Sequence, residues 1–180
     1  MGINSGGVQV GSELNWIDPD SLWHNSDSQI SHEPHKDSEM SAESNKLLIR
    51  QYIENVVNTG DISLVEEYIS PEYVEVYDGK RYRMGIAGAK EHIIGVRTTY
   101  PDLRLAIEQQ IAEADWVATC ITACGTHKGV WMGIEPTGKM VTYTGVNVDK
   151  VVDGRIIEHG GAANMLGPLL EIGAIKIAAR

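Results

Sequence analysis

Residues 125–139, GTHKGVWMGIEPTGK, place four glycines and one proline between two runs of strand-forming residues. Glycine relieves backbone crowding at the bends and bulges of a curved sheet, and proline cannot donate a hydrogen bond to a strand ladder. Pro136 therefore belongs at an edge or in a turn. The stretch predicts a hairpin excursion between a strand at 116–124 and a strand at 141–151.

The segments on either side of this hairpin complete a small domain. Further strands are expected at 73–77, 103–111 and 155–159. Apolar periodicity predicts three helices, at 41–60, 61–69 and 85–99. Ser41 and Asp61 are the expected N-caps of the first two. Three helices followed by a strongly curved antiparallel sheet form an α+β arrangement, and the open end of such a sheet can hold a ligand pocket.

Residues 1–40 differ in composition from the rest of the chain. They are rich in Gly, Ser, Asp and His and show no sustained apolar period, which predicts an acidic, low-complexity N-terminal arm before a domain at 41–180. The first 45 residues hold eight acidic residues and one lysine, whereas the remainder holds 17 acidic and 14 basic residues. The domain is thus nearly neutral and has no basic stripe, which excludes a nucleic-acid partner.

Other classes of protein and site are also excluded. The chain has no run of about 18 apolar residues and no signal-peptide pattern, so a cytoplasmic protein without a membrane partner is expected. Cys120 and Cys124 lie roughly 13 Å apart along one expected strand, beyond the reach of a disulfide. His32 and His35 lie in the arm without a rigid framework, so no metal site is predicted.

Four motifs carry a resemblance to a known family: PDL at 101–103, GTHKG at 125–129, GIEPTGK at 133–139 and DGRIIE at 153–158. In these motifs the chain resembles the SnoaL-like polyketide cyclases, also called ester cyclases, of the NTF2-like superfamily. The resemblance implies an NTF2-like (cystatin-like) cone, in which three N-terminal helices pack on a strongly curved antiparallel sheet. It also implies a hydrophobic small-molecule ligand, a homodimer and no cofactor.

The resemblance assigns the family's chemistry, an intramolecular aldol closure of a polyketide ester, to an aspartate near the end of the last strand. That position is Asn164 in this chain, and the family's nearby tryptophan is replaced by Gly160. Two further polar pocket positions of the family, a histidine and an arginine, align with Val76 and Cys120. An amide cannot exchange a proton at neutral pH, whereas an aldol closure needs a base and an acid. Asn164 keeps only the capacity to hydrogen-bond a carbonyl or enolate.

Glu158 and His127 are the other candidate catalytic residues. Glu158 shares strand alternation with Gly160, so both face the pocket if either does, and the same alternation assigns His159 to the opposite face. A desolvated Glu158 would have the raised pKa of a general base. His127, in the GTH motif, either acts on the ligand directly or fixes the hairpin through a ring hydrogen bond.

Candidate ligand-binding residues come from the sheet and the hairpin. Tyr143, Asn147 and Asp149 share one face of the expected strand at 141–151, which either lines the pocket or meets solvent or a second subunit. Gly160 removes bulk at the pocket mouth. The complete set is Cys120, Trp131, Tyr143, Asn147 and Gly160.

The leading hypothesis is a SnoaL-like polyketide or ester cyclase homologue that acts on or binds a hydrophobic carbonyl compound, with Asn164 in place of the catalytic aspartate. The first alternative is a non-catalytic small-molecule-binding or accessory domain. The second is an isomerase or hydratase that uses Glu158 or His127. The sequence leaves open whether the protein is an enzyme.

Overall fold

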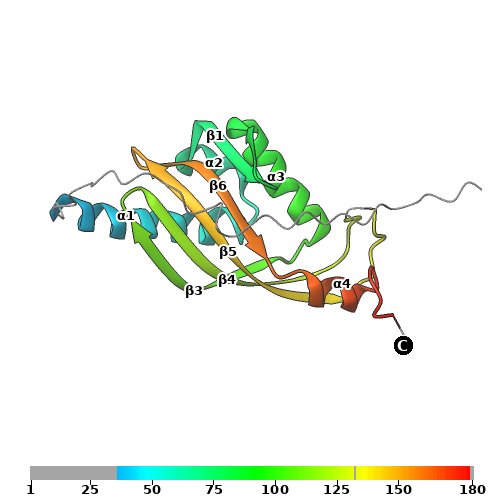
Figure 1. Ribbon diagram of the computed structural model, residues 1–180. Helices are drawn as coiled ribbons and strands as arrows, with labels where there is room; N and C mark the ends of the chain where they lie inside the picture. The colour runs from blue at the N-terminus through cyan, green and yellow to red at the C-terminus, as the bar shows by residue number, and fades with distance from the viewer. Residues whose placement is uncertain (1–35, 132, 179–180) are drawn as a thin grey trace, which may run out of the picture. The chain divides into compact units, whose positions relative to one another are not determined.

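The computed structural model describes residues 36–131 and 133–178, which form the predicted α+β arrangement (Figure 1). The α-helices are α1 (Lys36–Tyr52), α2 (Val65–Tyr68), α3 (Gly85–Thr99) and α4 (Leu166–Ile172). The strands are β1 (Ile69–Tyr77), β2 (Lys80–Arg83), β3 (Arg104–Glu113), β4 (Trp116–Thr126), β5 (Met140–Val152) and β6 (Arg155–Ala163).

The first helical region follows the capping signals of the sequence except at its start. Helix α1 begins at Lys36 rather than at Ser41, so the expected N-cap lies inside the helix. A π-helical turn, Ile53–Val57, extends α1, and the chain then turns at Gly60, whose φ is +78°. Asp61 caps the next turn as predicted, because its side chain accepts a hydrogen bond from the Ser63 backbone N–H at 3.0 Å. The predicted arm at 1–40 lies largely outside the described residues.

The strands form one six-stranded sheet in the order β2-β1-β6-β5-β4-β3. Neighbouring strands are antiparallel except β1 and β6, which are parallel. The predicted hairpin excursion connects β4 to β5 and is closed by backbone hydrogen bonds of 2.9 Å from His127 N to Lys139 O and from Gly138 N to His127 O. The sheet departs from regular pairing by register shifts in β3–β4, β5–β6 and β1–β6.

Two short elements were not predicted. Strand β2 reads KRYR and is exposed throughout, so it has no apolar alternation to reveal it. Helix α4 reads LGPLLEI, and its glycine and proline are poor helix formers. Neither changes the fold class. No described helix combines the length and apolar composition needed to cross a membrane.

Burial alternates along the central strands and shows which face of the sheet the helices cover. In β4, Val117, Thr119, Ile121 and Ala123 are buried, whereas the residues that alternate with them, 118, 120 and 122, are half-buried. The main core cluster joins Ile49 of α1 and Ile93 of α3 to this buried face. Cys120 and Cys124 fall on the other face of β4 and are both free thiols, as predicted.

Candidate functional site

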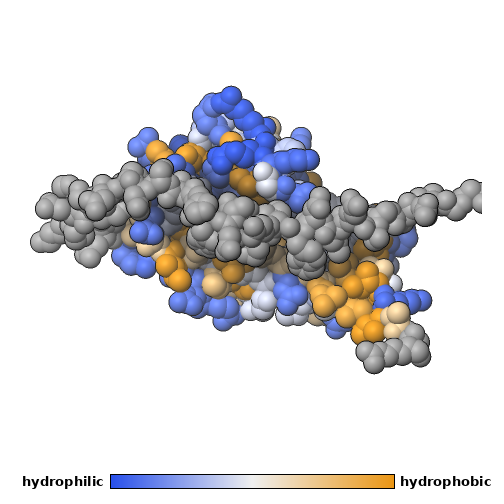
Figure 2. Space-filling view, viewed as in Figure 1, coloured by the Kyte–Doolittle hydropathy of each residue, from blue (hydrophilic) through white to orange (hydrophobic). Residues whose placement is uncertain are grey.

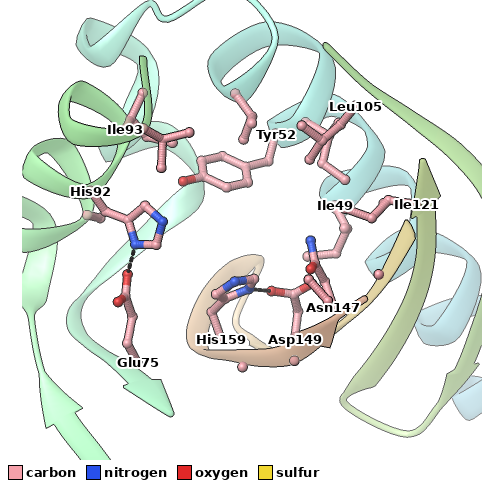
Figure 3. Close-up of a pocket in the computed structure, with 18 of the residues that line it drawn as sticks. Ile49, Tyr52, Glu75, His92, Ile93, Leu105, Ile121, Asn147, Asp149 and His159 are labelled. Atoms are coloured by element: carbon pink, nitrogen blue, oxygen red, sulfur yellow. Dashed lines mark hydrogen bonds and ion pairs between the residues drawn. The ribbon is translucent and has the colours of Figure 1, made fainter. Parts of the chain in front are cut away.

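A cavity of about 350 Å³ lies between α1, α3 and the buried face of the sheet (Figure 3). Aliphatic side chains form much of its wall, among them Ile49, Ile93, Leu105 and Ile121. Another part of the cavity is lined by the small residues at the end of β6, 160–163. The cavity therefore suits a mainly hydrophobic small molecule.

Three polar residues line up across the floor of this cavity. Asp149 on β5 and His159 on β6 are Cα partners, and His159 and Glu75 on β1 are Cα partners in the parallel pair. Nδ1 of His159 lies 2.7 Å from Oδ1 of Asp149. Since Asp149 is only 4% exposed, the pair is formed inside the fold rather than at its surface.

A second histidine–carboxylate pair faces the first from the helical wall. His92 on α3 places Nδ1 2.7 Å from Oε1 of Glu75, which also accepts a hydrogen bond of 3.3 Å from the Tyr73 hydroxyl. In Figure 3 His92 and His159 are on different sides of the cavity. Within the described part of the chain, Nε2 of neither ring has a hydrogen-bond partner. Both Nε2 atoms are available to a ligand.

The charges of this cluster act on one another. Burial alone favours the neutral form of His159, but the Asp149 hydrogen bond and the charges of Asp149 and Glu75 raise its pKa above the ordinary value. Burial also favours the neutral form of Glu75, which for a carboxyl group means a raised pKa. The hydrogen bond and charge of His92, together with the charge of His159, outweigh burial and hold the pKa of Glu75 below its ordinary value. Glu75 thus interacts electrostatically with both histidines.

Uncharged polar groups complete the lining. The Tyr52 hydroxyl points across the cavity toward His92, and the Asn147 amide projects into the cavity (Figure 3). Burial, followed by the nearby carboxylates, raises the pKa values of Tyr52 and Tyr73, and burial raises that of Tyr143. These phenols therefore stay protonated at neutral pH. The Tyr52 and Tyr143 hydroxyls can donate hydrogen bonds to a ligand, whereas that of Tyr73 already donates to Glu75.

Arg97 is the arginine of the cavity wall, but its guanidinium is already engaged. It donates hydrogen bonds to the backbone carbonyl oxygens of Val57, Asn58, Pro101 and Leu103 at 2.9–3.3 Å. It is therefore a structural cation rather than a partner for a ligand carboxylate. Among the described residues, no cluster of His, Cys, Asp and Glu has the arrangement of a metal site.

The structure separates the predicted ligand-binding residues into two groups. Tyr143, Asn147 and Gly160 line the cavity. Cys120 and Trp131 are not part of its lining: Cys120 is on the other face of β4, and Trp131 packs against the core cluster around Tyr100 and Ile121.

None of the three predicted catalytic residues lines the cavity. Asn164 is exposed just beyond β6, and its backbone N–H donates to Thr144 O at 2.8 Å. Glu158 pairs with Arg81 of β2. His127 is fully buried, with Nδ1 3.2 Å from the Thr137 hydroxyl, the kind of ring hydrogen bond that would fix the hairpin. A catalytic role for any of them remains a prediction.

The predicted face of His159 was wrong, because His159 lines the cavity and the side chain of Glu158 does not. Glu75 and His92 were missed as site residues. Asp149 was placed on the face of β5 that carries Tyr143 and Asn147, but it was not included among the candidate ligand-binding residues. Glu75 and His92 carry no sequence signal for this site, since only the tertiary fold brings β1 and α3 beside β6.

Comparisons with known proteins agree with this architecture. The family model of the SnoaL-like polyketide cyclases matches residues 47–172. The chain is 28% identical over 125 residues to nogalonic acid methyl ester cyclase of Streptomyces nogalater. The aligned region covers 64% of this chain and 88% of the relative. It is 29% identical over 129 residues to aklanonic acid methyl ester cyclase of Streptomyces galilaeus. The aligned region covers 69% of this chain and 88% of that relative.

Solved structures have the same fold. AclR from Streptomyces galilaeus, described as a putative hydroxylase, superimposes with a TM-score of 0.66 at 29% identity, over 75% of this chain and 99% of AclR. TsrD from Streptomyces laurentii has a TM-score of 0.66 at 24% identity, over 74% of this chain and 97% of TsrD, and shows the shared fold alone. With the family model spanning most of the domain, this chain belongs to the SnoaL-like polyketide cyclase family.

Proposed function

We propose that this protein catalyses cofactor-independent proton transfer on a hydrophobic carbonyl compound such as a polyketide ester, and that His159 and Asp149 supply chemistry that Asn164 cannot. The observation that carries the proposal is the His159–Asp149 pair, joined at 2.7 Å in a mainly aliphatic cavity. Imidazole is the side chain best suited to gain and lose a proton near neutral pH. The pair thus restores the acid–base function that an amide at position 164 lacks.

The pair has the organisation expected of a proton carrier. A carboxylate only accepts hydrogen bonds, so Asp149 holds a proton on Nδ1 of His159 and leaves Nε2 for the ligand. The same contact fixes the orientation of the ring and stabilises its protonated form. The aliphatic wall orients the hydrophobic part of a substrate, and the Tyr52 and Tyr143 hydroxyls and the Asn147 amide provide donors for its oxygen atoms.

The test uses nogalonic acid methyl ester and aklanonic acid methyl ester, because two relatives are named as cyclases of these compounds. Conversion is followed by chromatography and mass spectrometry. Wild type is expected to close the ring, and His159→Gln and Asp149→Asn to do so at least about 100-fold more slowly. Thr144→Val, on the outward face of β5, is the folding control. Equal rates in wild type and His159→Gln would rule out this mechanism.

Asn164 favours a second function, a non-catalytic ligand-binding or accessory domain, because the family's carboxylate is absent there. In that case both esters would raise the melting temperature of wild type without being converted. Turnover by Asn164→Asp alone would then identify a cyclase scaffold that has become a binder. The isomerase or hydratase alternative predicts instead that Glu158→Gln or His127→Asn abolishes activity.

A homodimer is also part of the proposal. The outward face of the sheet carries exposed apolar side chains, including Trp116, Val146 and Val148, and apolar residues also gather near α4 (Figure 2). An exposed apolar face of this kind is typical of a subunit interface. Light scattering after size exclusion at micromolar concentration should give twice the mass of 19.7 kDa. Replacement of Val148 by Lys should then give a monomer.

A further inference from the structure

We propose that His92 is a second catalytic residue of the cavity: its Nε2 removes the proton from the carbon that becomes the nucleophile, while His159 donates a proton to the carbonyl oxygen under attack. This division of roles rests on the proposed function, since it requires a carbonyl substrate in the cavity. It goes further by assigning the base to the helical wall and the acid to the sheet.

The placement of His92 gives it access to the ligand from a different wall than His159. His92 lies on α3 and its ring borders the cavity, whereas His159 lies on β6 in the cavity floor (Figure 3). An aldol closure joins two carbons of one substrate, so the proton leaves at one end of the forming bond and arrives at the other. Two proton carriers on separate walls match that requirement.

The hydrogen bond to Glu75 prepares His92 to accept a proton. Glu75 can only accept at its ionised oxygen, so Nδ1 of His92 carries the hydrogen and Nε2 of the neutral ring presents a lone pair. The negative charge of Glu75 then stabilises the imidazolium that forms when the proton is taken. Glu75 is itself held in place by the hydrogen bond from Tyr73.

The groups around each histidine distinguish the acid from the base. His159 contacts Asp149 and is also the cross-strand neighbour of Glu75, so two carboxylates favour its protonated form. His92 contacts one carboxylate and its side chain is 43% exposed, against 30% for His159. The titratable groups that face this pair are Asp149 from β5, Glu75 and Tyr73 from β1, and Tyr52 from α1. The two tyrosines do not compete as bases, because their pKa values are raised.

The proposed step balances in atoms and electrons. The C–H bond of the nucleophilic carbon breaks, its proton passes to Nε2 of His92, and the electron pair forms the new carbon–carbon bond. The carbonyl π bond breaks, and its oxygen takes the proton from Nε2 of His159. The substrate is isomerised without gain or loss of protons. His92 ends protonated and His159 neutral. Both side chains are partly exposed, so His92 releases its proton to water and His159 regains one from water.

Deuterium exchange separates the two roles. Each ester is incubated in D₂O, and exchange at the acidic carbon above the enzyme-free rate is measured alongside ring closure. His92→Gln is expected to reduce both exchange and closure by about 100-fold or more. His159→Gln is expected to keep exchange while closure falls by a similar factor. Glu91→Gln, an exposed neighbour on α3, is the matched control.

The outcomes are distinguishable from failure of the proposed function. If wild type neither exchanges nor closes either ester, the proposed function fails and the assignment of His92 fails with it. If wild type closes the ring and His92→Gln does so at the same rate, only the role of His92 is overturned. Loss of exchange in His159→Gln with exchange kept in His92→Gln would reverse the two roles and also overturn the assignment.

A pH profile gives an independent readout. Activity should fall as the pH rises through the raised pKa of His159, because the proposed acid then loses its proton. This alkaline limb should persist in the residual activity of His92→Gln and be absent from that of His159→Gln. An alkaline limb that is retained in His159→Gln would contradict the assignment of His159 as the acid.

Discussion

Asp149 and His159 meet because β5 and β6 slip by one residue between the turn and the site. Near the turn Val151 pairs with Ile156, but the next pair joins Lys150 to Glu158 and leaves Ile157 without a partner. This bulge brings His159, instead of Glu158, opposite Asp149. The side chains then meet at 2.7 Å in the cavity, while Glu158 pairs with Arg81.

The first prediction concerns stability and pH. The folded-state pKa of His159 lies above its ordinary value of 6.5, so the protonated pair adds stability that is fully present below pH 6.5. That stability is lost as the pH rises through the folded-state pKa. The melting temperature of wild type should therefore exceed that of His159→Gln by more at about pH 6 than at about pH 9.

The control for this prediction is Glu158→Gln, whose partner Arg81 stays charged throughout that range. Its difference from wild type should be the same at both pH values. An equal difference at both pH values for His159→Gln would contradict the pH dependence assigned to the Asp149 contact.

The second prediction concerns the ion pair between Arg81 and Glu158. The side chain of Arg81 is 64% exposed and that of Glu158 only 11%, so the two ends of the pair are not equivalent. Arg81→Gln leaves a nearly buried carboxylate without its cation and should cost about 1–2 kcal/mol of unfolding free energy. Glu158→Gln leaves an exposed guanidinium in water and should cost less.

Urea denaturation of both variants measures this difference. Turnover of the methyl esters should change by less than about threefold in either variant, because the pair lies outside the cavity lining. A large loss of turnover at unchanged stability in Glu158→Gln would instead favour the catalytic role considered from the sequence.

Much of the fold could be predicted because its signals are local. The apolar stripe of the first helix, the capping by Asp61 and the glycine-rich excursion at 125–139 each depend on neighbouring residues. The faces of β5 were predictable for the same reason, since that strand alternates without interruption from Val141 to Asp149. Tyr143 and Asn147 accordingly line the cavity.

The site was less predictable because it depends on one extra residue. Strand alternation places Glu158 and Gly160 on the same face of β6. Gly160 has no side chain and lines the cavity with its backbone, so its presence in the lining does not bring the Glu158 side chain into the cavity. The bulge at Ile157 decides which neighbour faces Asp149, and no sequence pattern marks it. Glu75 and His92 join the site only through the parallel β1–β6 pairing and the packing of α3 on β1.

The third prediction concerns Gly129 in the GTHKG motif. A Cβ at this position would lie 2.4 Å from the Thr98 carbonyl oxygen, because the Gly129 backbone N–H donates to Thr99 O at 3.1 Å and holds the two segments together. Gly129→Ala should therefore cost about 2–4 kcal/mol of unfolding free energy. Gly167→Ala is the matched control, since a Cβ there meets no atom within 4 Å.

Chemical denaturation of the two alanine variants checks this prediction. Gly167→Ala should stay within about 0.5 kcal/mol of wild type or gain slightly from better helix propensity. Equal stabilities for the two variants would mean that the contact between Gly129 and residues 98–99 does not constrain the hairpin.

The last prediction concerns Asn147, whose amide projects into the cavity and has no hydrogen-bond partner among the described residues (Figure 3). A half-buried amide that projects into a cavity can gain its partner from a ligand, and one such hydrogen bond is worth about 0.5–1.5 kcal/mol. Asn147→Ala should therefore weaken binding of either methyl ester by up to about tenfold, measured by titration calorimetry. Thr144→Val, outward-facing on the same strand, should bind like wild type. Unchanged affinity in Asn147→Ala would mean that the amide does not contact the ligand, and the polar recognition would then fall to the phenols and histidines of the cavity.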